Sequence, residues 1–142
     1  MKALKLATIS ASIIANTVYA DIVVIANISN SINELSAKEV RMIYLGKRSE
    51  LPNGKTVTAY DQKDDAESRS FFTKEVLRKS ISSLNSYWSR QMFSGKATPP
   101  KQIDGSAQSI INAVKNNPNA IAYIDAKYLT SDVKPLLTIS AQ

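Results

Sequence analysis

The chain has 142 residues, contains neither Cys nor His, and carries a formal net charge of +6. It therefore has no disulfide, no thiol nucleophile and no iron–sulfur site, and it lacks the usual zinc sites and neutral-pH proton shuttle. The length fits one domain. Its basic residues form no cluster beyond Arg78-Lys79, which argues against nucleic acid as a partner.

The first 20 residues have the pattern of a secretory signal peptide. Lys2 and Lys5 precede an apolar run over residues 6–18, and Val18-Tyr19-Ala20 supplies a small-residue cleavage site. The run is interrupted by polar residues and is shorter than the ~20 residues that a bilayer core requires. We predict cleavage after Ala20, a periplasmic location, and a single domain over residues 21–142 without a membrane anchor. Loss of the two lysines leaves a formal charge of +4.

Residues 22–28 are a continuous, mostly β-branched run, which is typical of a strand covered on both faces. We expect this strand to be central in a sheet. Ligands of open α/β sheets bind beyond the carboxyl ends of strands, so the polar loop with Ser29 and Asn30 is a candidate binding loop. An ordinary Ser/Asn turn is the alternative.

The middle of the chain predicts further helices and a strand. The capping box Ser36-Ala37-Lys38-Glu39 predicts a helix that ends at Gly46, and a strand is expected over residues 56–60. Apolar residues at helical spacing predict another helix within residues 80–93. The Pro-containing stretch 95–101 is expected to be an extended loop.

An acidic patch follows the strand at residues 56–60. Asp61, Asp64 and Asp65 lead into a helix with Phe72 on its apolar side. Acids in a first helical turn are stabilised by the helix dipole, so we interpret the patch as capping. The spacing does not match a calcium loop.

The stretch Asp104-Gly105-Ser106 opens a segment with a helical apolar stripe over residues 107–114. Its small residues would leave backbone N–H groups and the positive end of the helix dipole open to an anion. A buried strand is expected at residues 120–125, and a last strand at 133–139 lies at a sheet edge because of Pro135. The alternation predicts an α/β three-layer domain with a mixed sheet of about four strands.

Several stretches resemble phosphate ABC transporter substrate-binding proteins. They are residues 35–47, with a helix that ends in Tyr-Leu-Gly-Lys; residues 88–95, with Pro99-Pro100 after them; Gly105-Ser106; and the Asn/Pro turn and strand at 117–124. The likeness covers nearly all of residues 21–142, about half the usual length of such proteins. It implies a periplasmic-binding-protein-like (type II) fold. It also implies that the protein is not an enzyme and that it holds phosphate without a metal or cofactor. It also implies an ABC permease as partner, and we expect a monomer.

The resemblance and the helix-start argument together nominate a set of ligand-binding residues. They are Ser29, Asn30, Gln62, Ser68, Arg69, Gly105 and Ser106. Gln62 stands where the family has a phosphate-binding Arg, and Ala66-Glu67-Ser68 replaces a Ser-Gly-Thr helix start. A Gln cannot provide the bidentate, charge-assisted grip of an Arg.

Two other functions stay open at this point. One is a periplasmic interaction or sensor-input domain of the same fold that has lost high-affinity phosphate binding. The other is an enzyme, since Ser131 and Lys134 match a Ser-x-x-Lys motif, but the partner motifs of that catalytic class are missing from the sequence.

Overall fold

The computed structural model describes residues 3, 10–12 and 21–140. The predicted leader and its cleavage site thus lie outside the described residues, apart from residues 3 and 10–12. Among the helices described, none combines the length and the apolar character needed to cross a membrane.

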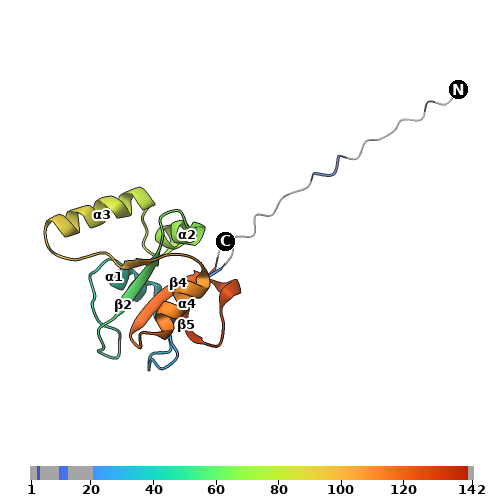
Figure 1. Cartoon of the computed structure of the whole chain (residues 1–142). Coiled ribbons are helices and arrows are strands. Elements are labelled where there is room, and N and C mark those ends of the chain that lie inside the picture. The colour runs from blue at the N-terminus through green and yellow to red at the C-terminus, as the bar shows by residue number, and fades with distance from the viewer. Residues whose placement is uncertain (1–2, 4–9, 13–20, 141–142) are drawn as a thin grey trace.

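A five-stranded mixed sheet forms the centre of the molecule, with strand order β3-β2-β4-β1-β5 (Figure 1). Strand β2 is parallel to both β3 and β4, whereas β1 is antiparallel to both β4 and β5. The strands are β1 (Ile22–Asn27), β2 (Thr58–Gln62), β3 (Lys101–Ile103), β4 (Ala120–Asp125) and β5 (Val133–Ile139).

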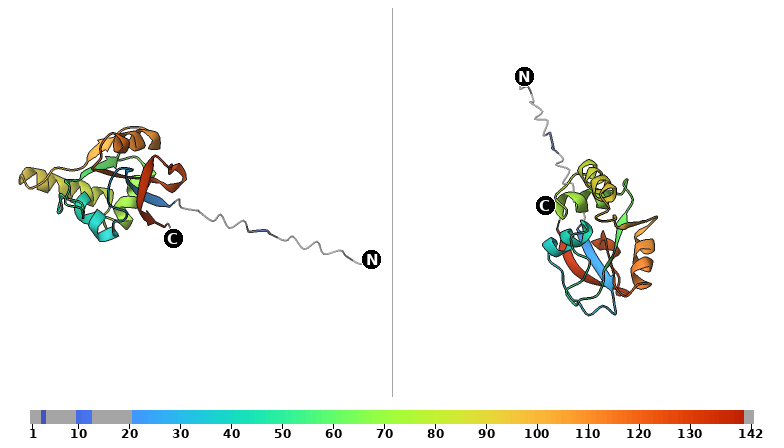
Figure 2. Two further views of the ribbon diagram at one scale, coloured as in Figure 1. Left: turned by 90° about the horizontal axis from the view of Figure 1, so that it is seen from below. Right: turned by 90° about the vertical axis from the view of Figure 1, so that its left-hand side faces the viewer.

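Helices cover both faces of this sheet, so the predicted three-layer α/β fold is confirmed. The helices are α1 (Ala37–Tyr44), α2 (Glu67–Glu75), α3 (Ile81–Phe93) and α4 (Ala107–Lys115), followed by the 3-10 turn η1 (Ala126–Tyr128). Helices α1, α2 and α3 pack on one face and α4 packs on the other, as the right panel of Figure 2 shows.

Strand β1 is buried along its whole length, as its β-branched run predicts. Successive side chains of a strand point to opposite faces. Val24 therefore joins the core beneath α1, α2 and α3, while Val23 and Ile25 join the core beneath α4. Such a strand needs apolar residues at every position, which explains the unbroken run.

Three aromatic rings fill the core between α1, α2 and β4. The rings of Phe72 and Tyr123 are stacked with centroids 3.8 Å apart, and Tyr44 meets Phe72 edge-on at 4.9 Å. Their packing fixes helix α2 against strand β4, next to the site described below.

The structure differs from the sequence-based expectation in the sheet. The fifth strand, β3, lies in the stretch after Pro99-Pro100 that was expected to be only a loop. Its three residues are mostly exposed and carry no apolar alternation, so its pairing with β2 leaves no signal in the sequence. Strand β2 begins and ends two residues later than predicted. Pro135 lies in the edge strand β5, beside a register shift, as expected.

Candidate functional site

The candidate site lies where the three parallel strands end. Strands β2, β3 and β4 run in the same direction, so their last residues, Gln62, Ile103 and Asp125, meet at one edge of the sheet. We call this region the carboxyl edge. In open α/β sheets such an edge is the usual place of a ligand.

Helices α2 and α4 both begin at the carboxyl edge, and both lack a side-chain cap. Ala66 precedes α2 and Ser106 precedes α4, and neither side chain accepts a hydrogen bond from the helix. The other two helices are capped, since Ser36 accepts from the Glu39 N–H and Ser80 accepts from the Ser83 N–H, each at 3.1 Å. Each cap satisfies one backbone N–H of its helix, whereas the two helices that start at the carboxyl edge have no side-chain cap.

Two contacts join the loops that lead into α2 and α4. Lys63, just after β2, forms an ion pair with Asp104, just after β3. Gln102 donates a hydrogen bond of 3.0 Å from Nε2 to Asp64 Oδ1. The N-termini of the two helices are therefore neighbours in space, although they are about 40 residues apart in the sequence.

Beside these loops lies a buried polar cluster, the Asp61 cluster, made of Asp61, Gln62, Ser68, Arg69 and Tyr123. The Tyr123 hydroxyl and the Gln62 backbone N–H both donate to Asp61 Oδ1. Arg69 Nε lies 3.4 Å from Asp61 Oδ2. Gln62 donates from Nε2 to the Tyr123 carbonyl at 2.8 Å and accepts from the Ser68 hydroxyl. The polar groups of the cluster are thus mostly paired with one another, while the buried Nη1 of Arg69 makes an ion-pair contact without a hydrogen bond.

Charge within the cluster is also balanced internally. Arg69 is only 4% exposed, and its Nη1 lies 3.0 Å from Asp64 Oδ1 in addition to the contact with Asp61. A buried guanidinium with two carboxylate neighbours has little positive charge left for an external anion. Burial raises the pKa of the Tyr123 hydroxyl well above its usual value, and the negative charge and hydrogen bond of Asp61 raise it further. Burial and then Asp61 raise the pKa of Tyr44 in the same direction.

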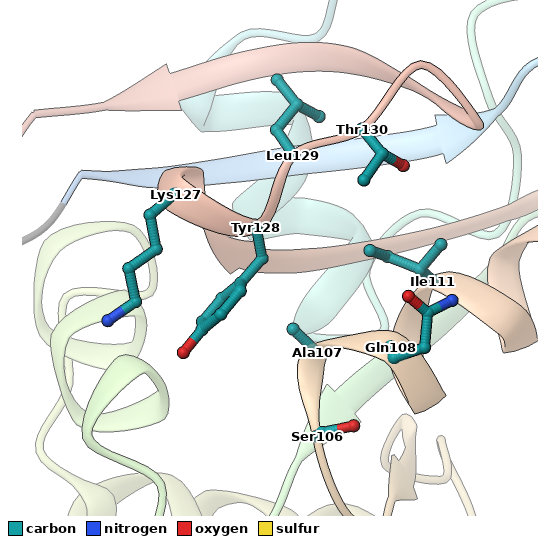
Figure 3. A pocket seen from close by; sticks show the side chains of 8 residues that line it. All are labelled: Ser106, Ala107, Gln108, Ile111, Lys127, Tyr128, Leu129 and Thr130. Atoms are coloured by element: carbon teal, nitrogen blue, oxygen red, sulfur yellow. The ribbon is translucent and has the colours of Figure 1, made fainter.

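A shallow groove opens at the N-terminus of α4, with a volume of about 470 Å³. Figure 3 shows the ring of Tyr128 alongside the first turn of α4, with Lys127 beyond it. The groove thus combines an uncapped helix start, one flexible cation and several apolar side chains. Its lining residues are Ser106, Ala107, Gln108, Ile111, Lys127, Tyr128, Leu129 and Thr130.

The structure brings together five of the seven nominated residues. Gln62, Ser68 and Arg69 lie in the Asp61 cluster, and Gly105 and Ser106 precede α4 at the same edge. Gly105 has a backbone φ of +95°, a conformation that favours glycine, and it lies in the short loop between β3 and α4.

Ser29 and Asn30 lie away from the other five nominated residues. Strand β1 runs antiparallel to β4, so its carboxyl end lies at the opposite edge of the sheet. There Asn30 Nδ2 donates to the Pro118 carbonyl, and Ser29 binds the side chain of Asn27, which holds the C-terminus of α4. Both residues are part of a turn, the alternative considered from the sequence.

The contacts of Asp61 and Lys134 differ from what the sequence suggested. Asp61 does not cap α2 but lies buried within β2, and the acid in the first turn of α2 is Glu67. Lys134, of the Ser-x-x-Lys match, donates from Nζ to the carbonyls of Asn30 and Ile32. That lysine is a loop anchor, with no geometry for activating a nucleophile. Within the described part of the chain, no group of acids is arranged to hold a metal ion.

Sequence reasoning missed Tyr123 and Lys63 as members of the edge. Tyr123 lies in an apolar strand and looked like a core residue, and its hydroxyl meets Asp61 only because β2 pairs with β4. The one available signal was the Asp beside the expected strand end, since a buried carboxylate requires donors.

No family model and no curated protein sequence matches the chain. Solved structures do match it. A putative phosphate ABC transporter substrate-binding protein from Clostridium perfringens, determined with bound phosphate, is 22% identical with a TM-score of 0.66 over 84% of this chain and 45% of that one. PstS from Borrelia burgdorferi is 14% identical with a TM-score of 0.62, over 84% and 48%.

A third match is an ABC-type phosphate transport receptor from Vibrio cholerae, 14% identical with a TM-score of 0.58, over 85% of this chain and 49% of the receptor. The chain spans about half the length of the solved structures it matches. At these identities the similarity concerns the fold. In its fold the chain resembles one lobe of a type II periplasmic binding protein, a class of non-enzymatic binding proteins that includes the phosphate-binding PstS structures.

Proposed function

We propose that the protein is a periplasmic substrate-binding-protein-like module for an ABC transporter, and that it binds a small oxyanion, phosphate being the first candidate. The observation that carries the proposal is that the two helices without side-chain caps, α2 and α4, both begin at the carboxyl edge. The anion would lie between their N-termini.

The chemistry of helix ends supports this position. Among the described residues, the backbone N–H groups of Glu67 and Ser68 in α2, and of Ala107 and Gln108 in α4, have no hydrogen-bond acceptor. These four N–H groups lie at the carboxyl edge, where the positive ends of both helix dipoles also lie. An oxyanion with several acceptor oxygens would satisfy them together.

We expect the affinity to be weak, because the charges around the donors oppose an anion. Arg69 is neutralised within the Asp61 cluster, and Lys63 is paired with Asp104. Six carboxylates and three cations lie near the α2 and α4 N-termini; these groups are Asp61, Asp64, Asp65, Glu67, Asp104, Asp125, Lys63, Arg69 and Lys127. The chain spans only about half the length of the solved structures it matches, and one lobe by itself cannot close over a ligand by hinge motion.

The direct test is a titration of the protein with phosphate and with sulfate, followed by the chemical shifts of the backbone amides. Binding at the proposed position moves the Glu67, Ser68, Ala107 and Gln108 resonances in a saturable way. Shifts that are absent up to tens of millimolar, or that spread evenly over the surface, contradict the proposal.

A second candidate function is a periplasmic interaction or sensor-input domain that has lost high-affinity phosphate binding. The observation in its favour is the closed Asp61 cluster, in which the residue at the family's Arg position binds only groups of its own chain. A periplasmic pull-down separates the two functions. A partner retained by a variant with Ser106→Asp, which removes the anion site, supports the interaction domain.

A further inference from the structure

The positive charge of the protein is concentrated in one region, which we call the α3 arm and define as residues 76–103. This stretch of 28 residues contains five cations and no acid; the cations are Arg78, Lys79, Arg90, Lys96 and Lys101. The rest of residues 21–142 holds eleven basic and twelve acidic residues, a net charge of −1. The net positive charge of residues 21–142 therefore comes from this stretch.

The cations of the α3 arm are available to a partner. The ion pairs between described residues use Lys63, Arg69, Lys115 and Lys127, all outside the arm. Within the arm, Arg78, Arg90, Lys96 and Lys101 are exposed. Lys79 is half-buried and lies over the ring of Tyr87, 5.1 Å from its centroid.

The tip of the α3 arm carries the most exposed large apolar side chain among the described residues. Phe93, the last residue of α3, is 98% exposed, and its neighbour Met92 is 53% exposed. Figures 1 and 2 show that the end of α3 stands out from the rest of the domain. These two neighbouring side chains form a small exposed apolar patch at a projecting position, next to the cations of the arm.

The tip is held rigidly. Leu84 and Trp88 of α3 are buried in the core, and the Trp88 ring packs against Gly46. The Tyr87 hydroxyl donates a 2.6 Å hydrogen bond to the Leu45 carbonyl. Phe93 is therefore kept in solvent by a fixed helix, so no rearrangement of α3 is needed for it to meet a partner.

We propose that the α3 arm is a peripheral membrane-binding element that docks on an anionic lipid surface, with Phe93 and Met92 inserted among the headgroups. The arm contains cations and no acidic residue, so its charge favours any anionic surface over one particular pattern of charges. Its apolar tip projects from the domain. A lipid surface accepts a convex apolar tip, whereas a protein partner would need a matching pocket. An interfacial aromatic side chain flanked by cations is the composition of such contacts.

The test uses residues 21–142, which contain every described helix and strand, so that the apolar run 6–18 cannot itself bind lipid. Binding is measured by co-flotation of the protein with vesicles. The vesicles consist of neutral phosphatidylcholine, or of phosphatidylcholine with one third phosphatidylglycerol. We expect binding to the anionic vesicles only, reduced at high salt. Neutralising Arg90 and Lys96 with Gln lowers the partition coefficient by about 10- to 30-fold, from about 1 kcal/mol per cation at the surface.

Matched controls distinguish binding through the arm from nonspecific electrostatic or apolar binding elsewhere on the surface. Lys38→Gln with Lys55→Gln removes the same charge elsewhere, and Ile28→Ser removes another exposed apolar side chain, one that is 60% exposed. Both controls bind as the parent does, whereas Phe93→Ser binds severalfold more weakly. A Phe93→Trp variant adds emission that shifts to the blue on anionic vesicles.

Three outcomes overturn the proposal. They are equal binding to neutral and anionic vesicles, a loss in the controls as large as in the arm variants, and no blue shift from the Trp at position 93. Equal capture by a soluble polyanion such as heparin, with Phe93→Ser unchanged, assigns the arm to acidic macromolecules instead of lipid. Thermal unfolding of each variant confirms that it is folded.

Discussion

Ser68 donates its hydroxyl hydrogen bond to the side chain of Gln62, so two residues expected to contact a ligand contact one another. Gln62 also donates to the Tyr123 carbonyl, which leaves one amide hydrogen of its side chain. An Arg at position 62 could not accept from Ser68, and the hydroxyl would be free. The exchange of Arg for Gln thus changes the role of both residues.

The Gln62→Arg variant should gain affinity for phosphate. A charge-assisted hydrogen bond is worth about 1.5–3 kcal/mol, which corresponds to a gain of about 10- to 100-fold. Calorimetric titration of the variant and the parent measures the difference. Gln62→Leu is the control, since it also breaks the bond to Ser68 without adding charge; an equal gain in that variant contradicts the explanation.

The Ser106→Asp variant should separate helix stability from anion binding. A carboxylate at this N-cap can accept the free N–H groups of α4 and stabilises the helix by about 0.3–1 kcal/mol through the dipole. The same carboxylate repels an oxyanion, so amide shifts on phosphate addition should vanish while the melting temperature rises slightly.

Ser80→Asp is the matched control for that experiment, because Ser80 is the N-cap of α3, outside the carboxyl edge. It introduces the same charge and should leave the phosphate response unchanged. A loss of response in both variants would show that net charge alone governs binding.

Replacing Arg69 should strongly destabilise the fold. Arg69→Met leaves the buried carboxylate of Asp61 without its cation, and breaking a buried pair in this way costs about 3–5 kcal/mol. Urea unfolding measures the loss. Lys74→Met, an exposed cation on the same helix, should change stability by no more than about 0.5 kcal/mol. The double variant with Asp61→Asn should recover part of the loss; no recovery would mean that the two residues do not act as a pair.

Gly46 and Gly54 allow a test of close packing beneath α3. Both have positive φ, +70° and +81°. At Gly54 a Cβ would meet nothing, and Gly54→Ala should cost only the backbone strain, about 1–2 kcal/mol. At Gly46 a Cβ would lie 3.0 Å from Ala97 Cβ and 3.1 Å from Trp88.

Gly46→Ala should therefore cost about 1–3 kcal/mol more than Gly54→Ala, from overpacking. The comparison is made by urea unfolding, with Trp88 fluorescence as a local probe. Equal losses in the two variants would contradict the tight contact between Gly46 and Trp88.

Stability should fall at alkaline pH because of Tyr44 and Tyr123. The folded protein raises the pKa of both hydroxyls above 10.0, chiefly by burial. The stabilisation that follows from these raised pKa values is complete below pH 10. It is lost as the pH rises above that value, because the unfolded chain releases these protons at lower pH than the folded protein does. Melting temperatures between pH 9 and 12 should show the fall.

Tyr123→Phe should make that alkaline fall shallower. Its loss of the bond to Asp61 lowers stability at neutral pH by about 1–3 kcal/mol. Absorbance at 295 nm should show that two of the five tyrosines in residues 21–142 ionise late, and one in the variant. Early ionisation of all five would contradict the buried arrangement.

Much of the fold could be predicted because its signals are local. The capping box at Ser36 and the small-residue start at Ser106 define where α1 and α4 begin, and helical periodicity places α3. The continuous apolar run of β1 requires cover on both faces, which implies a layered α/β domain. Caps, periodicity and side-chain polarity depend on neighbours within a few residues, so the sequence alone carries them.

The candidate site was only half predictable, because strand direction and pairing depend on distant parts of the chain. Ser29 follows a strand end as Gln62 does, yet β1 runs antiparallel to β4 and puts Ser29 at the opposite edge. The pairing of β2 with β4 buries Asp61 against Tyr123, and the pairing of β2 with β3 brings Lys63 to Asp104. The sequence by itself determined the elements and their apolar faces. Only the tertiary structure decided that Asp61 meets Tyr123 and that Lys63 meets Asp104, because these contacts join segments more than 40 residues apart.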